Sequence, residues 1–369
     1  MKKILYITIA DSVHDQRFMH MLVEGGFEGY ALRVSSGDWP TPAGVNPLEP
    51  MGFKFPLMQD QIPRFTQKLS GILRSLQPDL VQAGPLHDLA YLAVLAGAKP
   101  LLAQSWGFDL MHDSFANPEN LKRTNFVLSH SQGLIVDAHS SAKKAVELGF
   151  MLEHIYDFPW GVDLALFNKE KWHESGLEYR KQLGWEKNKV LFCLRSWEEK
   201  YGVLQLCQSF TEAAGVLPNL RLLLAGGGSQ EEEIKAILRK GKVENKAILP
   251  GRIPNRELPQ VFAAADIYVS PSHVDGSSVS LMEALASSLP ALVSDIPANL
   301  EWVQEGINGW VYPDGEMDDL TECILAASQA QLAPMQAAAR RTAEQKADWQ
   351  INKKVLMRAW KDLLQKEEV

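Results

Sequence analysis

The residues whose types and spacing best suit binding or catalysis lie in one stretch of the second half of the chain, residues 269–302. An apolar run is followed by a polar loop and by a segment that predicts a helix beginning at Ser277 or Ser278. The small residues Gly276, Ser277 and Ser278 offer a side-chain cap and several backbone N–H groups without a partner inside the helix. Because such a helix start combines free amides with the positive end of the helix dipole, it attracts phosphate.

Two carboxylates flank this predicted phosphate-binding site. Asp275 stands just before the helix, and Glu283 lies inside it, eight positions later. Vicinal hydroxyls of a ribose or a hexose are good partners for carboxylate oxygens, which only accept hydrogen bonds. A phosphate-binding site between two hydroxyl-binding carboxylates suits a nucleotide-sugar. A polar loop, a cap and a helix are also what any βαβ unit needs. The spacing alone therefore leaves open that these residues serve only the fold.

The order Asp275, seven residues, Glu283, then Ala-Leu-Ala and Pro290 resembles the donor-site segment of retaining glycosyltransferases of family 4 (group 1), which have a GT-B fold. The motif of that family is an acidic residue, seven others and Glu. The first acidic residue of the family motif is more often Glu. Asp275 has a shorter side chain than Glu and therefore a shorter reach to the donor sugar. The resemblance implies that Glu283 holds ribose hydroxyls and that Asp275 contacts the donor sugar.

Two cations precede this motif in the sequence. Arg195 ends a predicted strand, and Lys200 follows five residues later. A guanidinium can bind a diphosphate through two hydrogen bonds and an ammonium adds a point charge, so both would stabilise a departing nucleoside diphosphate. An isolated pair of this kind is usually a surface Arg and a solvated Lys. This pair, however, matches the Arg-x4-Lys pattern of the same family, with Tyr201 before Gly202 where relatives usually have Lys-Gly. We expect Arg195, Lys200 and the amides near Ser277–Val279 to neutralise the donor diphosphate.

A glycine-rich turn, AGGGS at residues 225–229, follows another predicted strand. A dinucleotide fingerprint would need a third glycine where Glu231 stands, which disfavours a dehydrogenase. We interpret the turn as a tight strand-to-helix connection near the donor, with Gly227 as a binding candidate. The resemblance also implies that backbone groups at Arg252 and Ile253 hold the nucleobase.

In the first half, QSWGFDLMHD places Trp106, Gly107 and Asp109 just after a predicted strand. Many relatives have a His beside the Gly, close to the reacting sugar. Here Trp106 occupies that position, as in a subset with a Trp-Gly-x-Asp signature. The resemblance therefore implies that Asp109 is the polar group nearest the reaction centre, with Trp106 and Gly107 on the acceptor side. His112 is a weaker candidate, because a lone His is usually a surface or core residue.

The first loop, ADSVHDQRF, resembles the acceptor-side turn of some relatives, which has a Ser-x-His and a following Arg. The resemblance nominates Ser12, His14 and Arg17 for contact with the acceptor or with phosphate. The loop lacks the Gly-Gly pair common elsewhere in the family. We interpret Gly25-Gly26, which come after the next helix, as the C-cap of that helix.

Composition limits the class of protein. A chain of 369 residues fits two domains, and 46% hydrophobic with 22% charged residues is ordinary for a globular protein. The formal charge of -8, from 37 basic and 45 acidic residues, argues against a general nucleic-acid binder. The three cysteines form no CxxC pair, so a reducing cytoplasm is the default. The N-terminal apolar run predicts a strand rather than a signal peptide, and no run of 18 apolar residues suggests a membrane span.

Short apolar runs rich in branched residues alternate with helical segments throughout, which is typical of parallel sheets covered by helices on both faces. We expect two doubly wound, Rossmann-type halves facing each other across a cleft, with ligands at the carboxyl ends of the strands. The predicted strands are 4–10, 30–34, 80–83, 101–104, 133–137, 155–158, 190–195, 221–225, 247–249, 267–270, 291–294 and 309–311.

The pattern predicts two domains, at 1–160 and 161–345, and the resemblance implies that the first is the acceptor-side domain and the second the donor domain. Residues 350–365 have the apolar spacing of an amphipathic helix. In GT-B enzymes the last helix often crosses back, and the resemblance implies that residues 346–369 return to the first domain. Residues 51–76 mix apolar and basic side chains, which indicates a loop and a sheet-covering helix. Peripheral contact with the inner face of a membrane is a minor hypothesis.

Metal ligation is not predicted. The nine histidines include no HExxH motif, and no DxD stands at a strand end in a convincing context. Asp318-Asp319 are explained by the dipole of the helix that begins there. Arg195, Lys200 and the helix amides could replace the divalent ion that other transferases use, so we expect neither metal nor cofactor.

These observations together predict an α/β protein of GT-B fold. The resemblance implies a metal-independent retaining glycosyltransferase that moves a hexose-type sugar from a UDP- or GDP-linked donor to a glycan, lipid-linked or small acceptor, by front-face attack. Two alternatives stay open, namely a nucleotide-sugar epimerase and a non-catalytic nucleotide-sugar binding protein. The nucleobase, the sugar and the linkage are not determined by these motifs.

Overall fold

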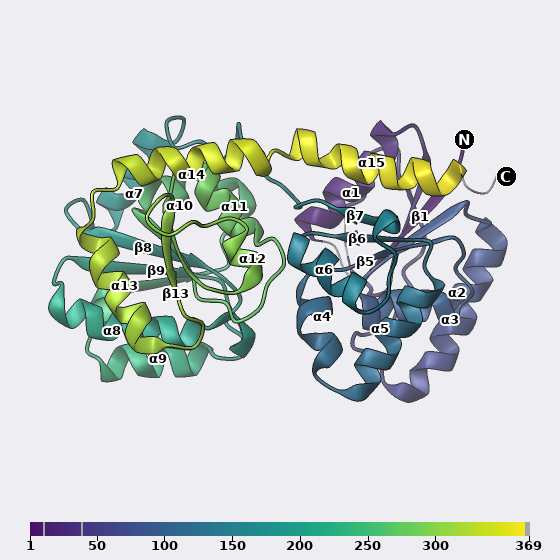
Figure 1. Ribbon diagram of the computed structural model, residues 1–369, viewed down its shortest axis with the longest axis horizontal. Helices are drawn as coiled ribbons and strands as arrows, with labels where there is room; N and C mark the ends of the chain where they lie inside the picture. The colour runs from purple at the N-terminus through teal and green to yellow at the C-terminus, as the bar shows by residue number, and fades with distance from the viewer. Residues whose placement is uncertain (10–11, 38–39, 366–369) are drawn as a thin grey trace. The chain divides into compact units, whose positions relative to one another are not determined.

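Two α/β units make up the computed structural model, which describes residues 1–9, 12–37 and 40–365 (Figure 1). The first unit contains Met1–Trp160 together with the C-terminal segment from Ile351. The second unit contains Gly161–Gln350. The chain therefore changes unit after residue 160 and again after residue 350.

The first unit is built on a seven-stranded parallel sheet with the order β3-β2-β1-β4-β5-β6-β7. Strand β1 pairs with β2 and β4, and Ile4 lies between Gly29 and Leu80. Helices cover both faces, which is why the strands are continuously apolar. The strands are β1 Lys3–Thr8, β2 Glu28–Arg33, β3 Asn46–Pro47, β4 Leu80–Ala83, β5 Leu101–Gln104, β6 Gly133–Val136 and β7 Ile155–Asp157.

The helices of the first unit form two layers. Helices α2 to α6 lie on one face of the sheet, and α1 and α15 lie on the other (Figure 1). The turn Leu86–Ala90, labelled η2, follows β4 and leads into α3. The helices are α1 Val13–Glu24, α2 Ile62–Leu76, α3 Tyr91–Leu95, α4 Phe108–Met111, α5 Pro118–His130, α6 His139–Glu147 and α15 Trp349–Gln365.

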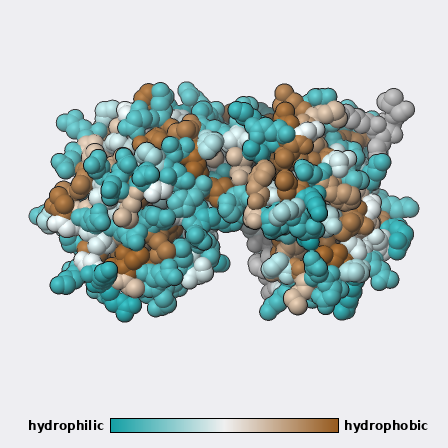
Figure 2. Space-filling view, turned by 60° about the horizontal axis from the view of Figure 1, so that its bottom comes forward, coloured by the Kyte–Doolittle hydropathy of each residue, from teal (hydrophilic) through white to brown (hydrophobic). Residues whose placement is uncertain are grey.

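The apolar side of the segment 51–76 packs into this unit. Met51 and Phe53 are buried ahead of α2, and Phe65 and Leu69 of α2 are buried in the same core. These side chains are therefore not available to a membrane surface. No helix in the part of the chain that the structure describes combines the length and the apolar character of a membrane span. On the face shown in Figure 2, hydrophobic residues lie in patches between hydrophilic ones.

Helix α15 is an integral part of the first unit, where the resemblance placed it. Trp360 is fully buried, and its indole Nε1 donates a hydrogen bond of 2.7 Å to Gln82 Oε1 on β4. Lys353 forms an ion pair of 2.7 Å with Glu24 at the end of α1. The helix thus closes one face of the sheet with both an apolar and a polar anchor.

Replacing Trp360 by Ala is expected to lower the free energy of unfolding of the first unit by about 3–5 kcal/mol, because it leaves a cavity and an unpaired Gln82. Urea unfolding followed by circular dichroism measures this loss. Ile351→Ala on the same helix is the matched control, since Ile351 is 55% exposed. A Trp360→Ala protein as stable as the control variant would mean that α15 does not close the core.

The second unit has a six-stranded parallel sheet with the order β10-β9-β8-β11-β12-β13. The order reverses between β8 and β11, and loops that follow such neighbouring strands form the binding edge of doubly wound sheets. The strands are β8 Lys189–Leu194, β9 Leu220–Ala225, β10 Ala247–Gly251, β11 Ile267–Ser270, β12 Ala291–Ser294 and β13 Gly309–Tyr312.

Helices also cover both faces of the second sheet. Figure 1 shows α8, α9 and α13 on one face and α7, α10, α11 and α14 on the other. The helices are α7 His173–Gln182, α8 Val203–Val216, α9 Glu231–Lys240, α10 Leu258–Ala264, α11 Val279–Ala286, α12 Pro297–Leu300, α13 Met317–Gln329 and α14 Ala333–Lys346. A short turn, Glu199–Tyr201 (η5), precedes α8.

The twelve predicted strands all occur, and four of them have the predicted bounds. Strand β3 was missed, because Asn46–Pro47 is too short to show an apolar pattern. The helix predicted to begin at Ser277 or Ser278 is α11, which begins at Val279. The predicted side-chain cap is wrong, because Ser278 makes no cap hydrogen bond and its hydroxyl has another partner.

Candidate active site

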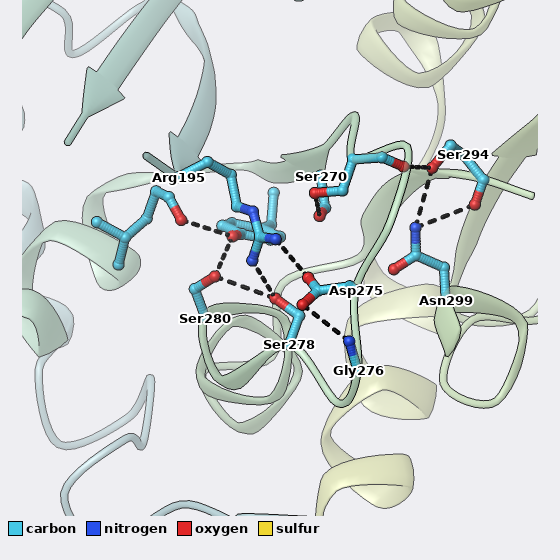
Figure 3. Close-up of polar contacts among 11 residues, drawn as sticks. Arg195, Ser270, Asp275, Gly276, Ser278, Ser280, Ser294 and Asn299 are labelled. Carbon is cyan, nitrogen blue, oxygen red and sulfur yellow. Dashed lines mark hydrogen bonds and ion pairs between the residues drawn. The ribbon is translucent and has the colours of Figure 1, made fainter. Parts of the chain in front are cut away.

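Arg195 is the centre of a buried polar cluster at the carboxyl edge of the second sheet (Figure 3). It follows β8, and its side chain is only 9% exposed. One guanidinium nitrogen, Nη2, forms an ion pair with Asp275, and the other, Nη1, donates a hydrogen bond of 2.7 Å to Ser278 Oγ. Burial alone would lower the pKa of Arg195, but the attraction of Asp275 leaves that pKa above its ordinary value. The guanidinium is therefore a fixed cation.

Asp275 lies in the loop between β11 and α11 and is committed to this cluster. One carboxylate oxygen, Oδ2, binds Arg195, and the other, Oδ1, accepts a hydrogen bond of 3.0 Å from the Gly276 N–H. Its side chain is 14% exposed. The structure thus gives Asp275 a direct role in orienting Arg195, which sequence reasoning missed. The contact of Asp275 with a donor sugar stays a prediction.

The Asp275 loop is also anchored from the strand beside it. Ser294, at the end of β12, donates a hydrogen bond of 2.5 Å from its hydroxyl to the Ser272 carbonyl. Asn299 Nδ2 in turn donates to both oxygens of Ser294 at 3.1 Å (Figure 3). The loop is therefore fixed on both sides, so Asp275 can hold Arg195 in one position.

Lys200 lies on η5, six residues after the end of β8, and is half-buried. Its Nζ lies 5.7 Å from the centroid of the Tyr201 ring, and the guanidinium carbon of Arg195 lies 4.5 Å from the same centroid. The aromatic ring is thus attracted to two cations that would otherwise repel each other. Tyr201, which the sequence showed only as a departure from the family pattern, belongs to the site for this reason.

The η5 turn is held against the Asp275 loop by a close backbone approach. Gly202 has a φ of +63°, and a Cβ at this position would lie 2.0 Å from the Pro271 carbonyl oxygen. The His273 N–H donates a hydrogen bond of 3.0 Å to the Lys200 carbonyl, and His273 Nδ1 lies 2.6 Å from Asp314 Oδ1. Glycine is therefore required next to the Lys200 turn.

The glycine turn after β9 lies beside Arg195. A Cβ at Gly226, where φ is +136°, would lie 2.0 Å from the Arg195 carbonyl oxygen, whereas a Cβ at Gly227 would meet nothing within 4 Å. The Gly226 N–H donates to the Gly251 carbonyl at 2.9 Å, which brings the exposed Arg252 into the same edge. Ile253 follows it and is half-buried. Their contact with a nucleobase stays a prediction.

Helix α11 places the remaining donor-site candidates around Arg195. Gly276, Ser277 and Ser278 are buried just before the helix, and Val279 opens it. Glu283 lies on the same helix at 4% exposure. The structure therefore brings Arg195, Lys200, Gly227, Asp275 and the start of α11 to one edge. The binding of ribose hydroxyls by Glu283 stays a prediction.

In the first unit, the structure brings His14 and Trp106 together, with their ring centroids 6.1 Å apart. Burial, and secondly the charge of Arg17, lowers the pKa of His14 to about 3, so its imidazole is neutral near pH 7. The Ser12 hydroxyl is engaged in the capping box of α1, where it donates to Asp15 Oδ2 at 2.6 Å. Acceptor contact by Ser12, His14, Arg17 and Trp106 stays a prediction.

Asp109 joins two loops of the first unit. It is completely buried, and its oxygens accept hydrogen bonds from Leu86 N at 2.8 Å, Ser105 Oγ at 2.6 Å and Trp106 N at 2.9 Å. Burial raises its pKa, and these hydrogen bonds oppose that shift. Asp109 therefore ties the loop of Trp106 and Gly107 to the turn after β4, a structural role that sequence reasoning missed. Its place near the reaction centre stays a prediction.

His112, the weaker candidate, is an exposed residue in a 2.8 Å contact with Asp113. Within residues 1–9, 12–37 and 40–365, no group of three or more His, Cys, Asp or Glu side chains has the geometry to hold a metal ion.

Residues 177–346 match the family described as glycosyl transferases group 1. The chain is 28% identical to the GtfA subunit of the UDP-N-acetylglucosamine–peptide N-acetylglucosaminyltransferase of Streptococcus agalactiae, over 47% of this chain and 32% of that protein. It is 24% identical to a GDP-mannose-dependent phosphatidylinositol monomannoside mannosyltransferase of Mycolicibacterium smegmatis, over 72% and 71% of the two chains. The chain spans less than half the length of the first curated relatives it matches.

The fold is that of HepE from Anabaena, whose structure in complex with UDP-glucose has a TM-score of 0.76 at 18% identity, with 96% of this chain and 98% of that chain covered. The matched family residues contain the start of α11, Asp275, Arg195 and Lys200, which the structure has gathered at one edge. The chain thus has the GT-B fold, and residues 177–346 of its second unit match the glycosyl transferases group 1.

Proposed function

We propose that this protein is a metal-independent retaining glycosyltransferase of the family 4 type, which transfers a hexose-type sugar from a nucleoside diphosphate sugar to a hydroxyl group of an acceptor. The observation that carries the proposal is the fixed Arg195 cation beside Lys200 and the start of α11. Preorganised cations and amides stabilise charge where it develops in the transition state, at no cost of reorganisation.

Charge develops on the diphosphate when the bond between the anomeric carbon and the phosphate oxygen breaks. Arg195 Nε is buried and has no hydrogen-bond partner among the described residues, so its N–H is a donor that a phosphate oxygen bound in the cluster would satisfy. Lys200 adds a second positive charge on the neighbouring turn. Both cations come from the segment directly after β8, so they act on the same leaving group.

The resemblance to family 4 supports retention, and neither carboxylate predicted to be catalytic is available as a nucleophile. Asp275 is bound to Arg195, and Asp109 is completely buried. For a retaining transfer we therefore infer attack by the acceptor hydroxyl on the face that the diphosphate leaves, rather than a covalent glycosyl-enzyme. The new bond forms between the acceptor oxygen and the anomeric carbon, and the hydroxyl proton passes to the departing phosphate oxygen.

The donor that we propose is UDP- or GDP-linked, since the relatives include an enzyme named for UDP-N-acetylglucosamine and one named for GDP-mannose. The acceptor that we propose is a glycan or a lipid-linked glycan. Relatives named for amylovoran and colanic acid biosynthesis support a polysaccharide product. We propose that the protein is cytoplasmic and that it contacts the inner face of the membrane to reach a lipid-linked acceptor.

A thermal-shift series with UDP-, GDP- and ADP-sugars in EDTA tests donor binding. One nucleotide is expected to raise the melting temperature selectively, since a ligand at 100 times its Kd stabilises the folded state by about 2.7 kcal/mol. The shift is expected to disappear in Lys200→Met and to persist in Lys187→Met, an exposed lysine of the same unit. The absence of any shift, or a shift that requires a divalent ion, would contradict the proposal.

The product distinguishes the proposal from the two alternatives. Incubation of the donor with a mixture of candidate acceptor glycans, followed by NMR of the anomeric proton, is expected to give a product with the configuration of the donor. Inversion would disprove retention. A changed free nucleotide-sugar would indicate an epimerase, and binding without any reaction would indicate a non-catalytic binding protein.

A further inference from the structure

The first unit contains a cavity of about 310 Å³ that the proposed function does not use. This volume lies at the lower end of the range of small-molecule sites, about 300–1,000 Å³. Its lining includes the apolar side chains of Phe55, Leu57 and Leu92. It also includes polar groups, namely one carboxylate, one guanidinium, one amide and one imidazole. A cavity lined by both kinds of group suits a ligand that has both apolar and polar parts.

Among the polar lining residues, Asp88 is unusual because its carboxylate has no hydrogen-bond donor among the described residues. Its side chain is 31% exposed, and its carboxylate accepts no hydrogen bond from the residues that the structure describes. The nearest nitrogen in an ion pair with it, His87 Nε2, lies 3.6 Å away, beyond hydrogen-bond distance. Burial raises the pKa of Asp88, and the charges of His87 and Arg123 oppose that shift. A ligand with O–H groups would supply the donors that this carboxylate lacks.

Arg123 and Asn120 face the cavity from α5, where a spacing of three residues places them on one side of the helix. Arg123 Nε donates to Glu119 at 3.1 Å, and the guanidinium lies 5.0 Å from the centroid of the Tyr91 ring. Its four Nη hydrogens donate to none of the described residues. Asn120 Nδ2 donates to the Asp113 carbonyl at 2.9 Å, which leaves Oδ1 as an acceptor. The arginine is thus oriented and still has donors for a ligand.

The chemistry of the lining selects one class of ligand. Acceptors on Asp88 and Asn120 and donors on Arg123 line the same cavity, which matches ring hydroxyls that donate and accept at once. The apolar lining residues match the C–H groups of a sugar ring. An anion would meet the Asp88 carboxylate, and a cation would meet the Arg123 guanidinium. We propose that this cavity is a carbohydrate-binding subsite for one neutral hexopyranose unit.

The cavity belongs to the same edge of the sheet as the predicted acceptor residues. His87 and Asp88 lie on η2, which follows β4, and Leu86 of that turn donates its N–H to Asp109 at 2.8 Å. Asp109 also holds the N–H of Trp106. One hydrogen-bonded connection therefore joins the cavity to the Trp106 loop. The assignment of the bound sugar to the acceptor rests on the proposed function, whereas the binding of a sugar does not.

Saturation-transfer NMR on the intact chain tests this subsite. The probes are the methyl α-glycosides of glucose, mannose, galactose and N-acetylglucosamine, each without any nucleotide, and UDP and GDP in separate samples. Asp88→Asn and Arg123→Met each remove one polar group of the cavity. Glu153→Gln, an exposed carboxylate of the same unit, is the matched control.

At least one glycoside is expected to bind the wild-type protein and the control, and to bind each cavity variant about tenfold more weakly, the loss for one charged hydrogen bond. Nucleotide binding is expected to be equal in all four proteins, which also shows that the variants are folded. Nucleotide binding without any glycoside binding, or glycoside binding that the variants leave unchanged, would overturn the subsite alone. Glycoside binding that the variants weaken, without nucleotide binding, would support the subsite and contradict the proposed function.

Discussion

Replacing Arg195 by Met is expected to lower the turnover of sugar transfer by about 10²–10³, the loss for one preorganised donor to a developing anion. The same change is expected to lower the free energy of unfolding by about 3–5 kcal/mol, because it leaves a buried carboxylate without its partner. That carboxylate is Asp275, whose side chain is only 14% exposed. A loss of activity in the single variant would therefore mix two causes.

The double variant Arg195→Met with Asp275→Leu separates these causes. Replacing both members of a buried ion pair by apolar residues of similar size is often neutral or stabilising, so we expect the free energy of unfolding to return to within about 1–2 kcal/mol of the wild-type value. Turnover is expected to stay low, because the cation that binds the diphosphate is still absent.

Urea unfolding followed by circular dichroism gives the stability of both variants, and donor consumption by anion-exchange chromatography gives their turnover. A stable double variant that transfers sugar at the wild-type rate would show that Arg195 serves only the fold. A single variant as stable as the wild type would show that the contact of Arg195 with Asp275 and Ser278 contributes little to folding.

Replacing Lys200 by Met is expected to lower turnover by about 10²–10³ as well, because a charge aimed at the leaving diphosphate is lost. Its effect on stability should be much smaller. Lys200 is half-buried on a short turn, and its cation–π contact with Tyr201 contributes about 0.5–1 kcal/mol. We therefore expect the free energy of unfolding to change by no more than about 1 kcal/mol.

Three measurements on the same preparations check this prediction. The ratio of kcat to KM is expected to fall in Lys200→Met and to recover in part in Lys200→Arg, which keeps the charge. Lys187→Met, a matched control for the lost charge, is expected to behave as the wild type. Near-normal turnover in Lys200→Met would exclude Lys200 from the catalytic machinery.

The alternation of apolar runs and helical segments was enough to predict the fold. Strands β4, β5, β11 and β12 have the predicted bounds, since each is a short, fully buried run between polar turns. This information is local, because burial on both faces of a parallel sheet requires continuous apolar residues. Strand β3 lacked such a run and was missed.

Local reasoning was less successful for side chains whose partners are distant in sequence. Ser278 was predicted to cap α11, but it accepts a hydrogen bond from Arg195, which is 83 residues away. Asp109 accepts hydrogen bonds from Leu86 and Ser105, and its contact with Leu86 in the turn after β4 was not predicted. Tyr201 had only the signal of departing from a family pattern, and its place beside two cations follows from the turn at Gly202.

The sequence by itself determined which residues are candidates for the donor site, because an acidic motif, a pair of cations and a helix start are patterns of type and spacing. Only the tertiary structure decided how these groups are paired. Asp275 and Arg195 are 80 residues apart, and they meet because β8 and β11 are neighbours where the strand order reverses. Strand order depends on the packing of the whole unit, so no local pattern predicts that the carboxylate expected to bind sugar also holds the arginine in place.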